Sequence, residues 1–242
     1  MSTARANPLW MDVTHRIRTM MREASMVPGD RLPTETELAQ RFGVNRHTVR
    51  RALKHLEEGG EIDARQGRGR FVRMPAIQYQ IGARPRFSNI LAGQDMAPST
   101  ELISIGVEQA QETLARALSL RTGSKVIHVE RLGRASGNPV SISSHYLPLG
   151  RFPRFIECYE RHHSITRTLE ECGVDDYVRR STHVTSRLPT SRERALLEVP
   201  KHVPLIVTRS CNVDTRGWPI ECGEARMASD RVELEIVSST QG

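Results

Sequence analysis

The chain has no long apolar segment. No run reaches the roughly 18 apolar residues that span a bilayer, and the first residues form no apolar core of a secretory signal. The four cysteines are scattered through the second half without a C-x-x-C pair, although soft-metal sites usually draw ligands from such close pairs. We therefore expect a cytoplasmic protein without membrane contact and without a metal site or disulfides. Its buried free thiols would be Cys158, Cys172, Cys211 and Cys222.

Motifs of nucleotide-binding and hydrolytic cores are also absent. The sequence holds no G-x-G-x-x-G, G-x-x-x-x-G-K or G-x-S-x-G. Its spacing nominates no pair of nucleophile and base and no cluster of metal ligands. These absences argue against an enzyme, and we expect no cofactor.

Positive charge is concentrated at the front of the chain. The 242 residues carry 35 Lys and Arg against 28 Asp and Glu, a net charge of +7. Residues 1–75 hold 14 of the basic and 9 of the acidic residues, which leaves 21 and 19 for residues 76–242. A positive domain attracts phosphate backbones and gains affinity by releasing their counterions. Many basic proteins bind no nucleic acid, so charge alone does not establish this partner.

Two helices are predicted before Gly43. Apolar residues recur at helical spacing over residues 9–24, and a Pro-Gly pair at 28–29 ends that pattern. Residues 34–37 have the Thr-x-x-Glu form of a capping box, in which a hydroxyl and a carboxylate satisfy free amides at a helix start. Gly43 would close this second helix at its C-terminus.

A third helix follows after a tight turn. Only Val44 and Asn45 precede it, and Asn45 is a natural N-cap. Its buried stripe is predicted to be Val49, Ala52, Leu53 and Leu56. Two helices joined by so short a turn indicate a helix-turn-helix. The opposite face is basic, as in a recognition helix that contacts base edges and phosphates, although a merely solvated face is the alternative. Its members are Arg46, His47, Thr48, Arg50, Arg51 and Lys54.

A basic hairpin is predicted directly after the third helix. A Gly-Gly pair at 59–60 ends the helix, and residues 61–72 alternate toward a short hairpin around Gln-Gly-Arg-Gly at 66–69. These glycines would let the backbone approach a groove closely, although they also suit a plain hairpin turn. Positive charge toward phosphates or a narrow minor groove comes from Arg65, Arg68 and Arg70.

This stretch resembles the winged helix of the GntR family of transcription regulators. The matching segments occur in order at residues 28–35, 38–39, 43–53, 66–69 and 71–72, which makes the resemblance highly specific. It implies a regulator that binds a double-stranded DNA operator, with contacts from Arg46, Thr48, Arg50, Gln66 and Gly67. With their basic neighbours, the predicted DNA-contacting set is Arg46, His47, Thr48, Arg50, Arg51, Arg65, Gln66, Gly67 and Arg68.

The remainder is predicted to be an α+β domain. Four β-rich runs form two hairpins, which indicates an antiparallel sheet. The runs span residues 126–134, 139–146, 205–213 and 219–226. Helical patterns lie at residues 111–120, 164–171 and 191–197, the last capped by Thr190 or Ser191.

The domain boundaries follow from a break in periodicity. Residues 74–85 lack a clear pattern and hold two prolines, so we interpret them as a linker with at most a short strand. The predicted domains are a winged helix-turn-helix at residues 1–73 and an effector domain at residues 86–242.

This second part resembles the UTRA effector domain of the HutC subfamily over most of residues 80–240. The resemblance rests on short motifs at residues 86–88, 93–99, 126–128, 131–140, 146–148, 164–165 and 230–231. It implies the chorismate-lyase-like fold, an antiparallel sheet with flanking helices. Within the subfamily, residues 44–48, 65–67 and 86–89 look most like PhnF-type regulators of phosphonate use. That likeness implies a small anionic effector of phosphonate or phosphate type.

The resemblance also implies an effector pocket. Relatives that bind phosphorylated sugars or similar anions use arginines, serines and a carboxylate, because guanidinium groups and hydroxyls satisfy phosphoryl oxygens. The matching positions are Ser88, Arg131, Arg134, Ser164, Thr166 and Glu224, and Ser144 and His145 lie on the strand that enters the same region. Plain structural roles are the alternative. Arg131 and Arg134 stand three apart on a strand and would point to opposite faces, Ser164 can be only an N-cap, and Glu224 can pair with a neighbouring arginine.

The sequence therefore predicts a homodimeric repressor. Its two winged domains would bind half-sites of a palindromic operator, and effector binding would change their placement and relieve repression. Three alternatives stay open. The first is the same class of regulator sensing a histidine-breakdown product or a phosphorylated sugar, the second an enzyme with a lyase-like C-terminal domain, and the third a DNA-binding architectural protein without an effector.

Overall fold

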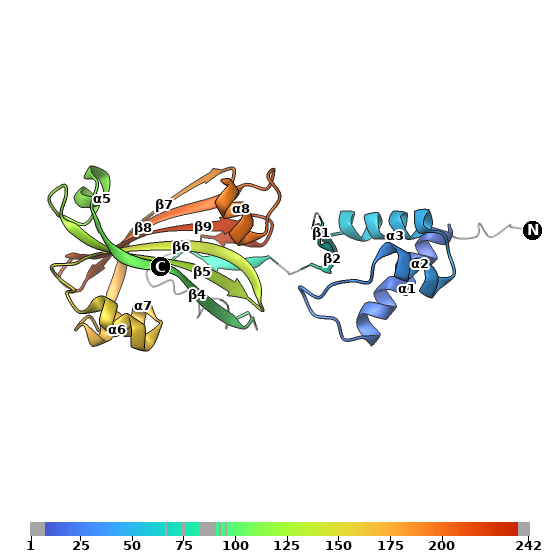
Figure 1. Cartoon of the computed structure of the whole chain (residues 1–242), viewed down its shortest axis with the longest axis horizontal. Coiled ribbons are helices and arrows are strands. Elements are labelled where there is room, and N and C mark those ends of the chain that lie inside the picture. The colour runs from blue at the N-terminus through green and yellow to red at the C-terminus, as the bar shows by residue number, and fades with distance from the viewer. Residues whose placement is uncertain are drawn as a thin grey trace, which may run out of the picture. The chain divides into compact units, whose positions relative to one another are not determined.

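The chain folds as two units that join between Pro75 and Ala76, and Figure 1 shows the computed structural model. The described residues are 8–65, 67–73, 76–82, 91, 93–94 and 96–236. Strand β3 (Ile77–Gln80) belongs to the second unit. Its residues lie within 74–85, the segment predicted as a linker with at most a short strand. Within the described part of the chain, no helix has both the length and the apolar character needed to cross a membrane.

Three helices and a hairpin make up the first unit. They are α1 (Leu9–Glu23), α2 (Glu35–Phe42), α3 (Arg46–Glu58), β1 (Ile62–Arg65) and β2 (Gly69–Val72). One apolar core joins them, and the four residues of the predicted α3 stripe all lie in it. Burying each Val or Leu side chain of this stripe stabilises the unit by about 1.5–3 kcal/mol. The predicted helix-turn-helix and wing are confirmed.

The ends of α2 and α3 are determined by local hydrogen bonds. The Thr34 hydroxyl accepts from the Glu37 amide, and the Glu37 carboxylate accepts from the Thr34 amide at 2.7 Å, which completes the predicted capping box. Gly43 ends α2 in the left-handed region at φ 66°. Asn45 then caps α3, because its Oδ1 accepts from the Thr48 amide at 2.8 Å.

Asn45→Ala is expected to lower the free energy of unfolding of the first unit by about 1 kcal/mol, because the cap is lost. Trp10 lies in α1 and reports this unit, while the chain's other tryptophan, Trp218, is 62% exposed in the second unit. The measurement is urea unfolding followed by Trp10 fluorescence in a Trp218→Phe background. Asn45→Ser keeps a capping oxygen and should stay close to the parent. An equal loss in both variants would contradict the capping role.

A six-stranded antiparallel sheet dominates the second unit, in the order β4-β5-β6-β9-β8-β7. The strands are β4 (Pro98–Gln109), β5 (Lys125–Ala135), β6 (Asn138–Pro148), β7 (Tyr177–Arg187), β8 (Leu205–Asp214) and β9 (Pro219–Ala228). The predicted hairpins are β5–β6 and β8–β9. A separate parallel pair joins β3 to β10 (Val232–Glu235), residue 77 opposite residue 232.

Helices cover both faces of this sheet (Figure 1). On one face lie α6 (Phe155–His162) and α7 (Ile165–Glu171), and on the other lie α5 (Glu112–Ala117) and α8 (Ser191–Leu197). The first pair packs on odd-numbered residues of β5 such as Val129, and α8 packs on even-numbered ones such as Leu132. This alternation decides which polar side chains share a face.

The four cysteine thiols are free. Three of them are buried, whereas Cys172 is half-buried. Burial is the largest contribution that raises the pKa of Cys172 to about 11, so this thiol stays protonated near neutral pH. Among the described residues, no group of three or more His, Cys, Asp and Glu side chains is placed to hold a metal ion.

Candidate functional site

The exposed face of α3 carries the predicted DNA-contacting side chains. Arg46, His47, Arg50 and Arg51 are all exposed along its first turns. Thr48 is half-buried, and its hydroxyl donates to Asn45 Oδ1 at 3.0 Å, so its side chain also supports the N-cap. This face has the shape and charge that a recognition helix presents to a major groove.

Glu35, at the start of α2, organises the arginines around α3. Its carboxylate accepts from Arg50 at 2.8–3.2 Å and from Arg70 at 3.0 Å, and Arg46 lies 3.9 Å away. Hydrogen bonds from Arg50 and Arg70 outweigh burial and lower the pKa of Glu35. Arg50 is therefore held in a defined orientation while its side chain stays 55% exposed.

The wing follows the same side of α3. Gly67 and Gly69 have φ values of 75° and 108°, which residues with a side chain rarely adopt. The backbone of the wing therefore favours glycine at both positions. Arg70 forms ion pairs with Glu35 and Glu57, so it links the wing to α2 and α3. Arg68 lies at the turn. Gln66 and the side chain of Arg65 lie outside the described residues.

Arg51 has a second contact that the sequence pattern does not reveal. Its guanidinium lies over the Trp10 ring, 4.7 Å from the ring centroid, and Trp10 also packs edge-on against His55. Such a cation–π contact is worth about 0.5–1 kcal/mol at an exposed site. Arg51 is thus directed toward α1, unlike Arg46 and Arg50.

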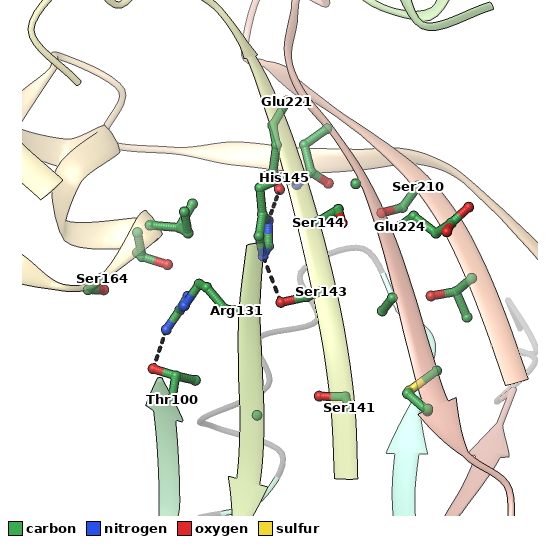
Figure 2. A pocket seen from close by; sticks show the side chains of 18 of the residues that line it. Thr100, Arg131, Ser141, Ser143, Ser144, His145, Ser164, Ser210, Glu221 and Glu224 are labelled. Carbon is green, nitrogen blue, oxygen red and sulfur yellow. Dashed lines mark hydrogen bonds and ion pairs between the residues drawn. The ribbon is translucent and has the colours of Figure 1, made fainter. Parts of the chain in front are cut away.

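A cavity of ≈350 Å³ opens on the α6–α7 face of the second unit (Figure 2). Strands β4 to β9 supply most of its wall, the start of α7 borders it, and Tyr79 of β3 joins the lining. Six of the eight predicted effector residues line it: Arg131, Ser144, His145, Ser164, Thr166 and Glu224.

Arg131 lines this cavity as a half-buried cation. Its guanidinium donates to the Thr100 hydroxyl of β4, and no carboxylate of the described residues forms an ion pair with it. Burial is the largest effect on Arg131 and lowers its pKa, but an arginine stays protonated in proteins. Glu221 raises the pKa of Arg131 electrostatically but forms no ion pair with it, so an anionic ligand would be the first direct charged partner of this guanidinium.

Hydroxyl groups at the start of α7 border the same cavity. Ser164 caps the helix, and its Oγ accepts from the Arg167 amide at 3.4 Å, a long bond. Thr166 Oγ1 lies 3.4 Å from the Tyr177 hydroxyl. Both hydroxyls therefore keep capacity for further hydrogen bonds.

Both ring nitrogens of His145 form hydrogen bonds with other side chains. Its Nδ1 lies 2.5 Å from Glu221 Oε1, and its Nε2 lies 3.1 Å from Ser143 Oγ. Glu221 Oε2 also accepts from Asn212 Nδ2 at 2.8 Å. Burial raises the pKa of Glu221, but the contacts with His145 and Asn212 outweigh it, and the net shift is downward. Of these four residues only His145 was predicted from the sequence. Ser143 lies two residues before His145 on β6, and this spacing places both side chains on the same face of the strand.

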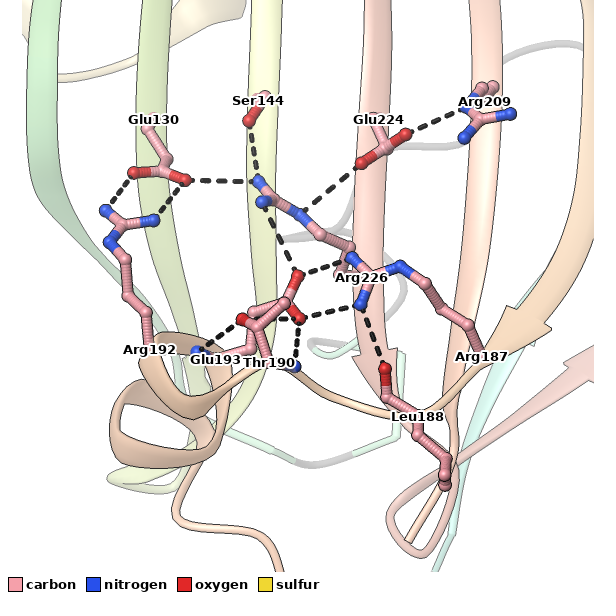
Figure 3. Close-up of polar contacts among 10 residues, drawn as sticks. All are labelled: Glu130, Ser144, Arg187, Leu188, Thr190, Arg192, Glu193, Arg209, Glu224 and Arg226. Carbon is pink, nitrogen blue, oxygen red and sulfur yellow. Dashed lines mark hydrogen bonds and ion pairs between the residues drawn. The ribbon is translucent and has the colours of Figure 1, made fainter. Parts of the chain in front are cut away.

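Ser144 and Glu224 border the cavity, but their polar atoms are engaged in a network with arginines (Figure 3). Ser144 Oγ accepts from Arg226 at 2.6 Å, and Glu224 accepts from Arg209 at 2.8 Å. Strand alternation directs Ser143 and His145 to one face and Ser144 to the other. The side chain of Glu224 therefore lies on the opposite face of the sheet from that of Arg131.

Of the predicted effector residues that the structure describes, Arg134 is not brought to the cavity. Arg134 donates to the Gly137 carbonyl at 3.2 Å and lies 3.5 Å from Glu101. It does not share the face of Arg131, because it stands three residues later on the strand and follows a bulge at Gly133. Ser88 lies outside the described residues.

Comparison with known proteins agrees with both units. Residues 10–72 match the model of bacterial regulatory proteins of the gntR family, and residues 93–233 match the UTRA domain. A chain of Rhizobium meliloti (strain 1021), named as an HTH-type transcriptional regulator, is 37% identical and covers 94% of each chain. The probable transcriptional regulator PhnF of Escherichia coli (strain K12) is 34% identical over 86% of each chain.

A solved structure extends this likeness to the fold. The crystal structure of PhnF from Mycobacterium smegmatis has a TM-score of 0.66 at 26% identity, covering 95% of this chain and 100% of that chain. These relatives are transcriptional regulators and not enzymes. The chain thus belongs to the GntR family of bacterial regulatory proteins, and it is a transcriptional regulator of GntR/PhnF type with a UTRA domain.

Proposed function

We propose that this regulator is a repressor whose operator binding is modulated by a small anion of phosphonate or phosphate type. The observation that carries the proposal is Arg131, a half-buried cation that lines the cavity without a carboxylate partner among the described residues. The resemblance to PhnF-type regulators of phosphonate use supports the same ligand class.

The chemistry of the cavity suits a tetrahedral anion. A guanidinium presents parallel N–H groups to two anionic oxygens, and hydroxyls supply further donors. Arg131 would provide the charge, and Thr100, Ser143, Ser164 and Thr166 the neighbouring hydroxyls. The face of α3 and the wing would contact the operator through Arg46, His47, Thr48, Arg50, Arg51, Arg65, Gln66, Gly67 and Arg68.

The regulatory step requires two chains. We propose a homodimer whose winged domains bind half-sites of a palindromic operator, since a two-fold protein matches a two-fold site. Effector binding changes operator affinity only if the anion prefers one arrangement of the winged domains over the other. Footprinting that shows a single winged domain on an asymmetric site would contradict this dimer.

Arg131→Ala is expected to abolish thermal stabilisation by the effector. A ligand that binds only the folded state stabilises it by about 2.7 kcal/mol at 100 times its Kd. The measurement is a thermal-shift series with inorganic phosphate, sulfate, methylphosphonate, 2-aminoethylphosphonate and phosphorylated sugars. Arg134→Ala is the matched control, because Arg134 lies on the same strand but outside the cavity lining.

The outcomes separate the proposal from its alternatives. A phosphonate shift that survives Arg134→Ala and disappears in Arg131→Ala supports the anion site. A shift with phosphorylated sugars alone would favour the sugar-sensing alternative. No shift with any of these anions, or equal loss in both variants, would overturn the anion proposal and turn attention to histidine-breakdown products.

A further inference from the structure

Three side chains of the cavity form a hydrogen-bonded relay that anion binding alone does not require. Ser143 Oγ lies 3.1 Å from His145 Nε2, and His145 Nδ1 lies 2.5 Å from Glu221 Oε1 (Figure 2). Asn212 holds the second carboxylate oxygen of Glu221 at 2.8 Å. The order hydroxyl, imidazole, buried carboxylate is the arrangement that activates a serine nucleophile.

The carboxylate determines which nitrogen of the imidazole faces the serine as a base. Glu221 is 5% exposed, and both its oxygens are hydrogen-bonded. An ionised carboxylate beside Nδ1 keeps the proton on that nitrogen, so Nε2 presents a lone pair to the Ser143 hydroxyl. Arg179 supports this corner, because its Nε donates to Asn212 Oδ1 at 3.2 Å.

A cation stands beside the nucleophile. Arg131 on β5 is the cross-strand partner of Ser143 on β6, and its guanidinium lines the same cavity. It can stabilise the negative charge that develops on an oxygen when a hydroxyl attacks a phosphoryl or carbonyl group. Ser143 and His145 are both half-buried at the cavity wall, so a small reagent can reach them.

We propose that Ser143 is a nucleophilic modification site for compact electrophilic phosphonyl or acyl compounds. His145 is its general base, and Glu221 is a positioning residue. With a fluorophosphonate, Ser143 Oγ attacks phosphorus, its proton moves to His145 Nε2, the O–P bond forms and the P–F bond breaks with release of fluoride. The reaction is stoichiometric and leaves the chain a regulator.

The test is labelling of the full chain with a small alkyl fluorophosphonate, followed by intact mass and peptide mapping. One adduct per chain at Ser143 is expected, and Ser143→Ala should remove it. Ser141→Ala is the matched control, since Ser141 lies two residues earlier on the same strand and also lines the cavity. It should label at the parental rate.

A substitution of His145 tests whether this residue activates Ser143 as a general base. His145→Gln should slow labelling by about 100-fold or more, the usual contribution of a general base. His163→Gln, which changes another histidine of the cavity lining, should leave the rate unchanged. Melting temperatures verify that each variant is folded.

Two results would overturn the proposal: labelling that survives Ser143→Ala, or no labelling of the folded parent. An unchanged rate in His145→Gln would overturn the role of the base. The thermal-shift series with anions does not depend on this reaction, so failure here leaves the proposed function to its own test.

Discussion

Arg50→Ala is expected to weaken operator binding by about 5- to 150-fold, the loss of roughly 1–3 kcal/mol that a bidentate base contact supplies. Arg50 stands one turn after Arg46 on the exposed face of α3, and its guanidinium is already oriented by Glu35 at 2.8 Å. Glu35 also binds Arg70, which in turn pairs with Glu57. Helix α2, helix α3 and the wing thus position one fork of N–H donors, which reduces the entropy lost on binding.

The measurement uses an operator selected from random duplexes by the parent chain, with affinities from fluorescence anisotropy over a salt series. Arg50→Lys keeps the charge but loses the planar fork, so it should preserve the salt dependence and lose discrimination among sequences. Arg116→Ala, on an 80% exposed side chain of the second unit, is the control and should bind as the parent does. A parental affinity in Arg50→Ala would remove this residue from the proposed interface.

Local signals explain why the first unit could be predicted almost completely. Its helix ends depend on residues within four positions of each other, such as the Thr34–Glu37 box and the Asn45 cap. The β5–β6 and β8–β9 hairpins were also predictable, because glycine-containing turns separate β-rich runs.

Elements without such signals were missed. Helix α6 has no side-chain cap at Arg154, and its C-cap, His163, has left-handed backbone angles. A glycine at that position would have indicated a helix end in the sequence, but a histidine does not. Strands β4 and β7 are the edges of the sheet and are largely exposed, so their apolar alternation is weak. Burial on one side is what creates a clear pattern, and edge strands lack it.

The cavity was predictable only in part for a similar reason. Arg131 and His145 lie in the predicted hairpin, but Glu221 and Asn212 reach His145 through the pairing of β6 with β9 and of β9 with β8. Such contacts depend on the order of strands in the sheet. No spacing within one segment encodes them, so the partners of a known site residue could not be named from sequence.

The α8 face of the sheet holds a network of carboxylates and guanidinium groups (Figure 3). Its centre is Glu193, which is 3% exposed and accepts from both terminal nitrogens of Arg187 at 2.6–2.7 Å. The same carboxylate caps α8 by accepting from the Thr190 amide at 2.8 Å, and Arg226 lies 3.8 Å away. Removing the carboxylate takes this partner from Arg187, whose side chain is 41% exposed, and from Arg226, whose side chain is 11% exposed.

These contacts, led by the Arg187 hydrogen bond, lower the pKa of Glu193 to about 2 from an ordinary value of 4.5, against the effect of burial. Because the carboxyl is more acidic in the folded state, its contribution to stability is present above pH 4.5 and is lost as the pH falls toward 2. The shift corresponds to a contribution of about 3 kcal/mol at neutral pH.

Glu193→Gln is therefore expected to lower the free energy of unfolding of the second unit by about 3 kcal/mol at pH 7 and by much less near pH 2. The measurement is urea unfolding followed by far-UV circular dichroism between pH 2 and pH 7. The unfolding transition of the second unit is the one that Trp10 fluorescence, which reports the first unit, does not detect. Glu112→Gln, on a 75% exposed side chain, is the control and should change neither value by more than about 0.5 kcal/mol. A Glu193→Gln curve parallel to that of the parent at every pH would show that Glu193 acts through packing and helix capping, because only an ionised carboxylate loses its stabilising effect on protonation.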